Sequence, residues 1–135
     1  MMMTRAEAEK RLKKIFHKEH FFDEQWNAIE RLLCGERVLM IQRTGFGKSL
    51  CYQFPATQFP GISIVISLMR DQVRALKELE IPAACINSEQ SKEDNNNVIE
   101  QAQRGELKIL YIAPERQNNE DWLSAVQRMK ISMIV

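Results

Sequence analysis

The chain of 135 residues has few cysteines, little glycine or proline, and no strong excess of either charge. It holds 3 Cys, 5 Gly and 4 Pro, and 19 Lys and Arg stand against 18 Asp and Glu. Cys34, Cys51 and Cys85 are widely spaced and form no Cys-x-x-Cys pattern, so we interpret them as reduced core thiols of a cytoplasmic protein, not as a zinc site. The net charge of +1 gives no sign of a nucleic-acid partner but is compatible with one, because a local patch can be basic.

The sequence also lacks a long hydrophobic run. The longest apolar stretch, residues 62–68, is interrupted by Ser63 and Ser67 and falls far short of the ~20 residues that a membrane helix needs. The first residues lead into charged side chains and not into an apolar signal core, so we expect no export. With 44% hydrophobic and 27% charged residues, the composition is that of one ordinary globular domain that needs no disulfide or metal to fold.

Helical patterns occupy the first quarter of the chain. Thr4 begins a capping-box pattern at the start of a predicted helix over residues 4–16. Asp23 is expected to cap a second helix over residues 23–33, which Gly35 ends. Beyond this point the hydrophobic period changes from that of helices to that of buried strands.

Short apolar runs then alternate with helical patterns to the end of the chain. The predicted strands cover residues 38–41, 62–67, 83–86, 107–112 and 131–135. The predicted helices between them begin near Ser49 and then cover residues 68–79, 91–105 and 121–130. This alternation predicts an α/β fold with a mainly parallel sheet covered by helices on both faces.

A glycine-bearing loop follows the first predicted strand and leads into a helix, and it reads Thr44-Gly45-Phe46-Gly47-Lys48-Ser49. A phosphate-binding loop has this context: backbone N–H groups turn around the anion, Lys48 reaches the β- and γ-phosphates, and the Ser49 hydroxyl binds Mg²⁺. Gln42 stands where the strict pattern has Gly, and the Phe46 ring has to point away from the phosphates. The alternative is a glycine turn with a chance Gly-Lys-Ser.

The loop continues as Gly47-Lys48-Ser49-Leu50-Cys51-Tyr52-Gln53-Phe54-Pro55-Ala56, and on this segment the sequence resembles the first motor lobe of RecQ-family DNA helicases, within helicase superfamily 2. Two later segments are similar to further motifs of that family, Leu68-Met69-Arg70-Asp71-Gln72-Val73 and Tyr111-Ile112-Ala113-Pro114-Glu115-Arg116. Phe21 with Gln25 resembles the upstream adenine-reading motif Phe-Arg-x-x-Gln. The resemblance spans about residues 11–135.

The resemblance implies a RecA-like P-loop NTPase lobe of an ATP-dependent DNA helicase that moves 3′ to 5′ and acts in DNA repair or recombination. It implies ATP and Mg²⁺ as cofactors, and single-stranded DNA, duplex DNA and a second RecA-like lobe as partners, with a nucleoid location if the protein is bacterial. By resemblance, Lys48 and Ser49 are catalytic, with Ser49 on the metal, and nucleotide contacts come from Phe21, Gln25, Thr44, Gly45, Phe46, Gly47, Lys48 and Ser49. The DNA contacts are Ser67, Arg70, Gln72, Pro114 and Arg116. Trp26, Tyr111 and Trp122 are interpreted as core residues and not as base-stacking groups.

The sequence departs from the family pattern at four places. Phe22 stands where the family usually has Arg, and Phe46 replaces a small residue. About four residues that normally follow Ser67 are absent, either through a true deletion or because a loop is missing from the sequence. The strand ending at Val135 resembles the one that leads into the Asp-Glu-Ala-His box, so residues 1–135 are interpreted as the N-terminal part of lobe 1, truncated before that box, and expected to hydrolyse ATP negligibly alone.

Two other functions remain open from the residues. The chain could be another P-loop NTPase, such as a kinase, although neither an acceptor site nor a lid is evident. It could also be a degenerate, non-catalytic module that binds nucleotide or DNA. Nucleotide binding compared with that of a Lys48→Ala variant, with and without single-stranded DNA, separates these functions.

Overall fold

The computed structural model describes residues 2–40, 47–67 and 70–135. The chain divides into two compact units, Met1–Gln58 and Phe59–Val135. The predictions made for residues 41–46, which include Thr44, Gly45 and Phe46, lie outside the described residues, as does the start of the helix predicted at Leu68.

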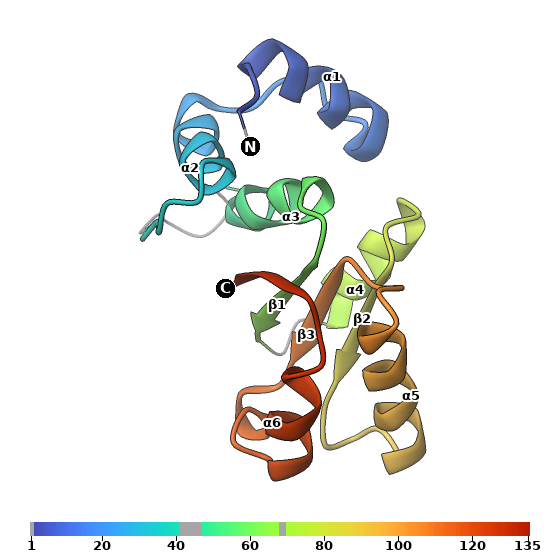
Figure 1. Ribbon diagram of the computed structural model, residues 1–135. Coiled ribbons are helices and arrows are strands. Elements are labelled where there is room, and N and C mark those ends of the chain that lie inside the picture. The colour runs from blue at the N-terminus through green and yellow to red at the C-terminus, as the bar shows by residue number, and fades with distance from the viewer. Residues whose placement is uncertain (1, 41–46, 68–69) are drawn as a thin grey trace. The chain divides into compact units, whose positions relative to one another are not determined.

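The first unit is helical, with α1 at Arg5–Phe16, α2 at Asp23–Leu33 and α3 at Lys48–Gln58 (Figure 1). The hydroxyl of Thr4 accepts a hydrogen bond from the Glu7 N–H at 3.2 Å, which confirms the predicted cap of α1. The bounds of α2 are also as predicted, but Asp23 is not its cap. Phe22 occupies that position, and the Asp23 carboxylate in the first turn accepts a hydrogen bond from Arg5 at 2.7 Å.

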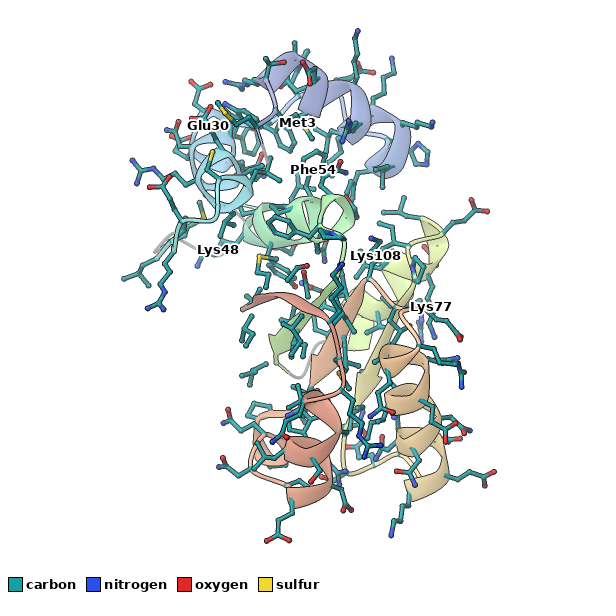
Figure 2. The ribbon with its side chains drawn as sticks, viewed as in Figure 1. Met3, Glu30, Lys48, Phe54, Lys77 and Lys108 are labelled. Carbon is teal, nitrogen blue, oxygen red and sulfur yellow. The ribbon has the colours of Figure 1, made fainter. Side chains whose placement is uncertain are left out.

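Aromatic rings form the core of this unit. Phe54 of α3 is fully buried, and its ring centroid lies 6.3 Å from that of Phe16 and 5.1 Å from that of Phe21 (Figure 2). Phe21 in turn stacks on Trp26 with their centroids 5.8 Å apart. Rings at these separations contribute about 0.5–1.5 kcal/mol per pair beyond the burial of their area. Trp26 is therefore a core residue, as predicted.

Residues 38–40 do not form the predicted buried strand. The Leu39 side chain is 86% exposed, and an open hollow lies between this segment and the side of α2 that carries Asn27 and Arg31. The apolar run at residues 38–40 thus predicted a strand where the structure has none.

The second unit alternates strands and helices around a parallel sheet. Its elements are β1 at Ile62–Ile66, α4 at Arg70–Glu78, β2 at Ala83–Ile86, α5 at Lys92–Gln103, β3 at Ile109–Ile112, a 3₁₀ turn at Pro114–Arg116, α6 at Glu120–Val126 and β4 at Ile131–Ile134. The strand order is β2-β3-β1-β4, and every neighbouring pair is parallel. This arrangement confirms the predicted α/β fold, although α6 is shorter than predicted.

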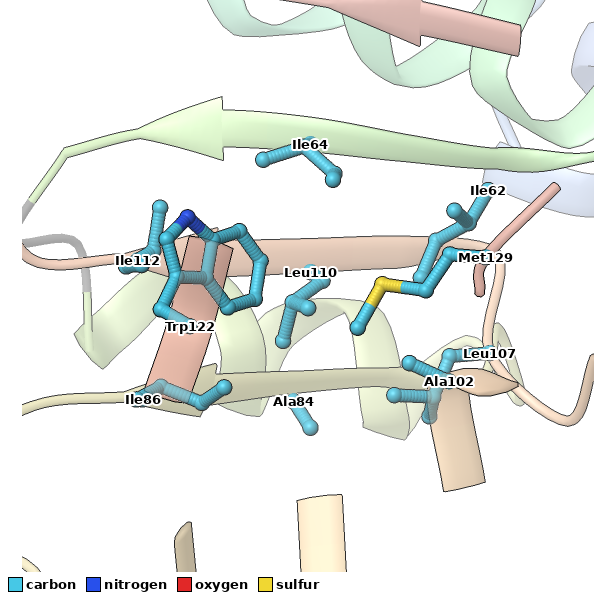
Figure 3. Close-up of a cluster of buried hydrophobic side chains, with 10 residues drawn as sticks. All are labelled: Ile62, Ile64, Ala84, Ile86, Ala102, Leu107, Leu110, Ile112, Trp122 and Met129. Carbon is cyan, nitrogen blue, oxygen red and sulfur yellow. The ribbon is translucent and has the colours of Figure 1, made fainter. Parts of the chain in front are cut away.

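Helices cover both faces of this sheet. On one face, α5 and α6 contribute Ala102 and Trp122 to a buried apolar cluster that also contains Ile64 and Leu110 (Figure 3). On the other face, Val73 and Leu76 of α4 are buried. Tyr111 and Trp122 are 0% and 5% exposed, so both belong to the core as predicted. Because the strands are parallel, their carboxyl ends all meet at one edge.

The prediction of three core thiols is wrong for Cys34. All three cysteines are free, but Cys34 follows the last turn of α2 and is exposed, whereas Cys51 is buried and Cys85 half-buried. In the described part of the chain, no helix is long and apolar enough to cross a membrane.

Candidate functional site

The start of α3 carries the predicted phosphate-binding residues that the structure describes. Gly47 directly precedes the helix, Lys48 and Ser49 form its first turn, and the Lys48 side chain is exposed (Figure 2). The first N–H groups of a helix have no partner within the helix and attract anions. An exposed lysine and a hydroxyl beside these N–H groups form an arrangement that can hold a phosphate.

Gln25 of α2 contacts this loop through a direct hydrogen bond. Its amide Nε2 donates to the Gly47 carbonyl oxygen at 3.2 Å, while its Oε1 accepts from the Phe22 N–H at 2.8 Å. Gly47 has φ +85°, and a Cβ there would lie 2.7 Å from Gln25 Nε2. The backbone conformation therefore favours glycine at position 47, and a side chain there would also displace the Gln25 amide.

The turn between α1 and α2 is held by two charged side chains of α1. The Phe21 N–H donates to Glu9 Oε2 at 3.0 Å, and Arg5 donates to the Phe21 carbonyl at 2.6 Å. Burial acts to raise the pKa of the Glu9 carboxyl, but hydrogen bonds from Phe21, His20 and Arg5 outweigh it and leave that pKa below its ordinary value. Glu9 therefore stays ionised at neutral pH and fixes the backbone at Phe21.

Cys51 lies one turn into α3, and burial raises the pKa of its thiol to about 11. Because the thiolate is the reactive form, we expect Cys51 to resist iodoacetamide at pH 8 in the folded chain, while exposed Cys34 is alkylated quickly. Labelling of Cys51 should rise only as the pH approaches 11. Timed alkylation followed by peptide mass spectrometry checks this, with the unfolded chain as the control in which all thiols react. Rapid labelling of Cys51 at pH 8 would contradict the expectation.

The second unit brings two of the predicted DNA-contact segments to one edge of its sheet. Ser67 follows β1, and the turn containing Pro114 and Arg116 follows β3, the neighbouring parallel strand. The Ser67 N–H donates to the Ile112 carbonyl at 3.0 Å, which places the two strand ends side by side. Open α/β sheets bind their ligands at this carboxyl edge.

Two side chains at this edge differ in what they offer a ligand. The Nε atom of Arg116 is buried and has no hydrogen-bond partner among the described residues, so a ligand at the surface could be reached only by the other guanidinium nitrogens. Gln72 of α4 accepts a hydrogen bond from the Tyr111 hydroxyl at 2.9 Å, so part of its amide is used inside the unit. Arg70 is the first residue of α4.

Sequence reasoning missed the contacts that position these residues. The bond between Gln25 and Gly47 joins positions 22 residues apart, and no local pattern signals it. Phe21, predicted to contact nucleotide, is 3% exposed and belongs to the aromatic core, whereas its neighbour Phe22 is 60% exposed. In the described ranges, no three His, Cys, Asp or Glu side chains are grouped to hold a metal ion.

Known proteins similar to this chain point to one family. The sequence matches the family model described as DEAD/DEAH box helicase over residues 22–135. It is 37% identical over 118 residues to the ATP-dependent DNA helicase RecQ of Synechocystis sp., which covers 84% of this chain and 25% of that protein. It is 42% identical over 98 residues to the ATP-dependent DNA helicase RecQ of Bacillus subtilis, covering 70% of this chain and 17% of that protein.

A vertebrate protein is similar over the same region. The RecQ-like DNA helicase BLM of Xenopus laevis is 38% identical over 117 residues, which covers 79% of this chain and 9% of that protein. The chain thus spans a quarter or less of the length of these three curated relatives. The family match includes α2, α3 and the whole parallel sheet. The chain therefore belongs to the DEAD/DEAH box helicase family and, within it, to the RecQ helicases.

Proposed function

We propose that this chain is the ATP-binding part of an ATP-dependent DNA helicase that unwinds duplex DNA in the 3′ to 5′ direction, in DNA repair or recombination. The observation that carries the proposal is the position of Gly47, Lys48 and Ser49 at the start of α3, with Gln25 bonded to Gly47, in a chain of the RecQ family. Two relatives are named as ATP-dependent DNA helicases, which supports the proposal that this chain binds both ATP and DNA.

The proposed nucleotide site lies at the start of α3 and includes Gln25 of α2. Lys48 would bind the β- and γ-phosphates together with the N–H groups at the start of α3, and the Ser49 hydroxyl would hold Mg²⁺. Thr44, Gly45, Phe46 and Gly47 are proposed as further nucleotide contacts. Gln25 makes two hydrogen bonds among the described residues, with Phe22 and Gly47, and an amide has a second N–H and a second lone pair that can contact the adenine edge. Phe21 acts from within the core, by holding the turn in front of Gln25. Bound Mg²⁺ neutralises charge on the phosphates.

The DNA site is assigned to the carboxyl edge of the sheet, at Ser67, Arg70, Gln72, Pro114 and Arg116. The guanidinium of Arg116, a cation in the turn that follows β3, supports a contact with the phosphate backbone. Such contacts are independent of sequence, so binding to single-stranded DNA should weaken steeply as salt is added. A second RecA-like lobe of the full-length protein completes the motor, because transition-state charge in this chemistry needs further cations. A cytoplasmic location, at the nucleoid in a bacterium, fits this role.

The Lys48→Ala variant tests the nucleotide site. A hydrogen bond to a charged group contributes about 1.5–3 kcal/mol, so we expect ATP binding in the presence of Mg²⁺ to weaken about 10- to 100-fold. Isothermal titration calorimetry measures the effect, and Lys77→Ala in α4 is the matched control because Lys77 is also an exposed lysine. If Lys48→Ala and Lys77→Ala bound ATP equally well, Lys48 would not belong to the nucleotide site.

Single-stranded DNA in the same titration separates the alternatives. A helicase lobe should bind both ligands, with DNA affinity that falls as salt rises. Nucleotide binding without any DNA binding would favour another P-loop NTPase. DNA binding without nucleotide binding would favour a degenerate module, and would contradict the proposal.

A further inference from the structure

We propose that Asn95 is a positioning residue for the DNA contact made by Arg116. The inference rests on the proposed function, because it takes Arg116 as part of the DNA site at the carboxyl edge of the sheet. Asn95 lies near the start of α5 and is not itself a residue of that site. It acts by fixing the loop that joins β2 to α5, and this loop in turn holds the turn after β3 that carries Arg116.

Asn95 is a polar side chain in a buried position, and both ends of its amide are hydrogen-bonded. It is only 4% exposed. Its Nδ2 donates to the Asn87 carbonyl oxygen at 2.9 Å, and its Oδ1 accepts from Gln90 Nε2 at 2.7 Å. A buried amide is costly unless it is bonded in this way. The two bonds therefore attach α5 to the loop that precedes it.

The loop between β2 and α5 is fixed by further bonds of the same residues. Asn87 is 7% exposed, and its Oδ1 accepts from the backbone N–H groups of Glu89 and Gln90 at 2.9 and 3.0 Å. The Gln90 amide also donates to the Cys85 carbonyl in β2 at 2.9 Å. A polar network whose side chains are bonded to one another and to the backbone holds a segment in one conformation. Loss of Asn95 should loosen this loop.

The end of β2 and its loop contact the turn that carries Arg116 at two points. The Ala113 N–H, directly before the turn, donates to the Ile86 carbonyl at the end of β2 at 3.0 Å. Within the turn, Glu115 Oε1 accepts from the Ser88 hydroxyl at 3.3 Å. Since Glu115 is the residue next to Arg116, the loop sets where the turn presents its cation to a phosphate.

DNA binding by variants of the two ends of this chain of contacts tests the inference. Binding of fluorescein-labelled oligothymidylate is measured by anisotropy for Asn95→Ala and Ser88→Ala, each alone and combined with Arg116→Ala. We expect Arg116→Ala to weaken binding about 10-fold or more, and each of the other two to weaken it about 2- to 10-fold. In the Arg116→Ala background neither should weaken it further, because the group that they position is gone.

The salt dependence separates positioning from a general loss of stability. Each phosphate contact contributes about 0.7 to the slope of log affinity against log salt for a single strand. Arg116→Ala should make this slope shallower by about that amount, and Asn95→Ala should change it in the same direction. Gln103→Ala is the matched control, because the Gln103 amide belongs to the opposite end of α5 and donates to the Ala125 carbonyl of α6 at 3.2 Å. It should change neither the slope nor the affinity.

The variants also distinguish failure of the inference from failure of the DNA site. If the losses of Asn95→Ala and Arg116→Ala added in full, the amide would act on the whole unit and not through Arg116. If Arg116→Ala weakened binding while Asn95→Ala and Ser88→Ala did not, the DNA site would stand and the positioning role would fail. If Arg116→Ala had no effect, or the unaltered chain bound no DNA, both proposals would fail.

Folding of each variant is followed by urea unfolding through Trp122, which lies in the same unit. Asn95→Ala removes the partner of a buried carbonyl and is the variant most exposed to unfolding. Ser88 is exposed, so Ser88→Ala keeps the unit folded and removes only the bond to Glu115. If Asn95→Ala does not fold, the comparison of Ser88→Ala with and without Arg116→Ala decides the inference by itself.

Discussion

Replacing Phe54 by alanine is expected to lower the free energy of unfolding by about 3–5 kcal/mol, the range for a fully buried phenylalanine. Phe54 has no exposed surface, and its ring contacts those of Phe16 and Phe21 at the centre of the first unit. The variant loses the transfer free energy of the ring and leaves a cavity that three helices cannot close without moving. Because typical domains are stable by only about 5–15 kcal/mol, the loss would leave this unit close to unfolding.

Each unit contains one tryptophan, so the two can be followed separately. Trp26 lies in the first unit beside Phe21 and Trp122 lies in the second, so urea unfolding of Phe54→Ala in a Trp122→Phe background follows the first unit alone. Leu39→Ala is the control, because Leu39 is 86% exposed and its loss should change stability by less than about 0.5 kcal/mol. A loss below 1 kcal/mol for Phe54→Ala would show that the aromatic cluster does not hold the unit together.

The order and type of most elements could be predicted because they depend on signals within a few residues. Thr4 and Ser91 each cap a helix by accepting from the N–H three residues later, which a sequence pattern displays directly. The runs at Ile62 and Ile109 form strands because their residues are buried on both faces of a parallel sheet. Alternation of these two patterns was enough to predict the α/β fold.

The failures have a common physical cause, which is dependence on a distant partner. Val38 and Leu39 have the composition of a buried strand, but a strand exists only where another strand accepts its hydrogen bonds. Asp23 has the composition of a helix cap, but its carboxylate is bound to Arg5, 18 residues away. Cys34 has the residue type of a core position but is exposed, because the burial of a thiol depends on packing and not on its neighbours in sequence.

In the candidate site, too, the residues with a local sequence signal could be predicted, and the contacts that depend on distant residues could not. Gly47, Lys48 and Ser49 could be found from sequence because phosphate binding uses backbone N–H groups and adjacent residues. The bond from Gln25 to Gly47 could not, and neither could the exposure of Phe22 beside the buried Phe21, since both depend on how α2 and α3 pack. Sequence motifs therefore identify the chemistry, while the packing of helices decides which side chains face the ligand.

Replacing Gly61 by alanine is expected to cost about 2–4 kcal/mol through the pairing of β4 with β1. A Cβ at this position would overlap the Lys130 carbonyl oxygen and would lie 2.6 Å from Ser132 Oγ. The same residues hold the two strands together, because the Gly61 N–H donates to Ser132 Oγ and the Ile62 N–H donates to the Lys130 carbonyl, both at 2.8 Å. The added methyl group therefore pushes apart the strands at the point where they first pair.

A double-mutant cycle with Ser132→Ala identifies the cause of this loss. Ser132→Ala alone should cost about 1 kcal/mol for one hydrogen bond, and it removes the Oγ contact but not the contact with the Lys130 backbone. Gly61→Ala should then still destabilise the Ser132→Ala chain by about 2 kcal/mol or more in urea unfolding followed through Trp122. Gly105→Ala is the control for glycine itself, because Gly105 has φ +76° and no atom within 4 Å of its added Cβ, so its cost of about 1–2 kcal/mol is conformational alone. If Ser132→Ala restored full stability to Gly61→Ala, the hydroxyl and not the backbone would set the spacing of β1 and β4, since a backbone carbonyl cannot be relieved by changing a side chain.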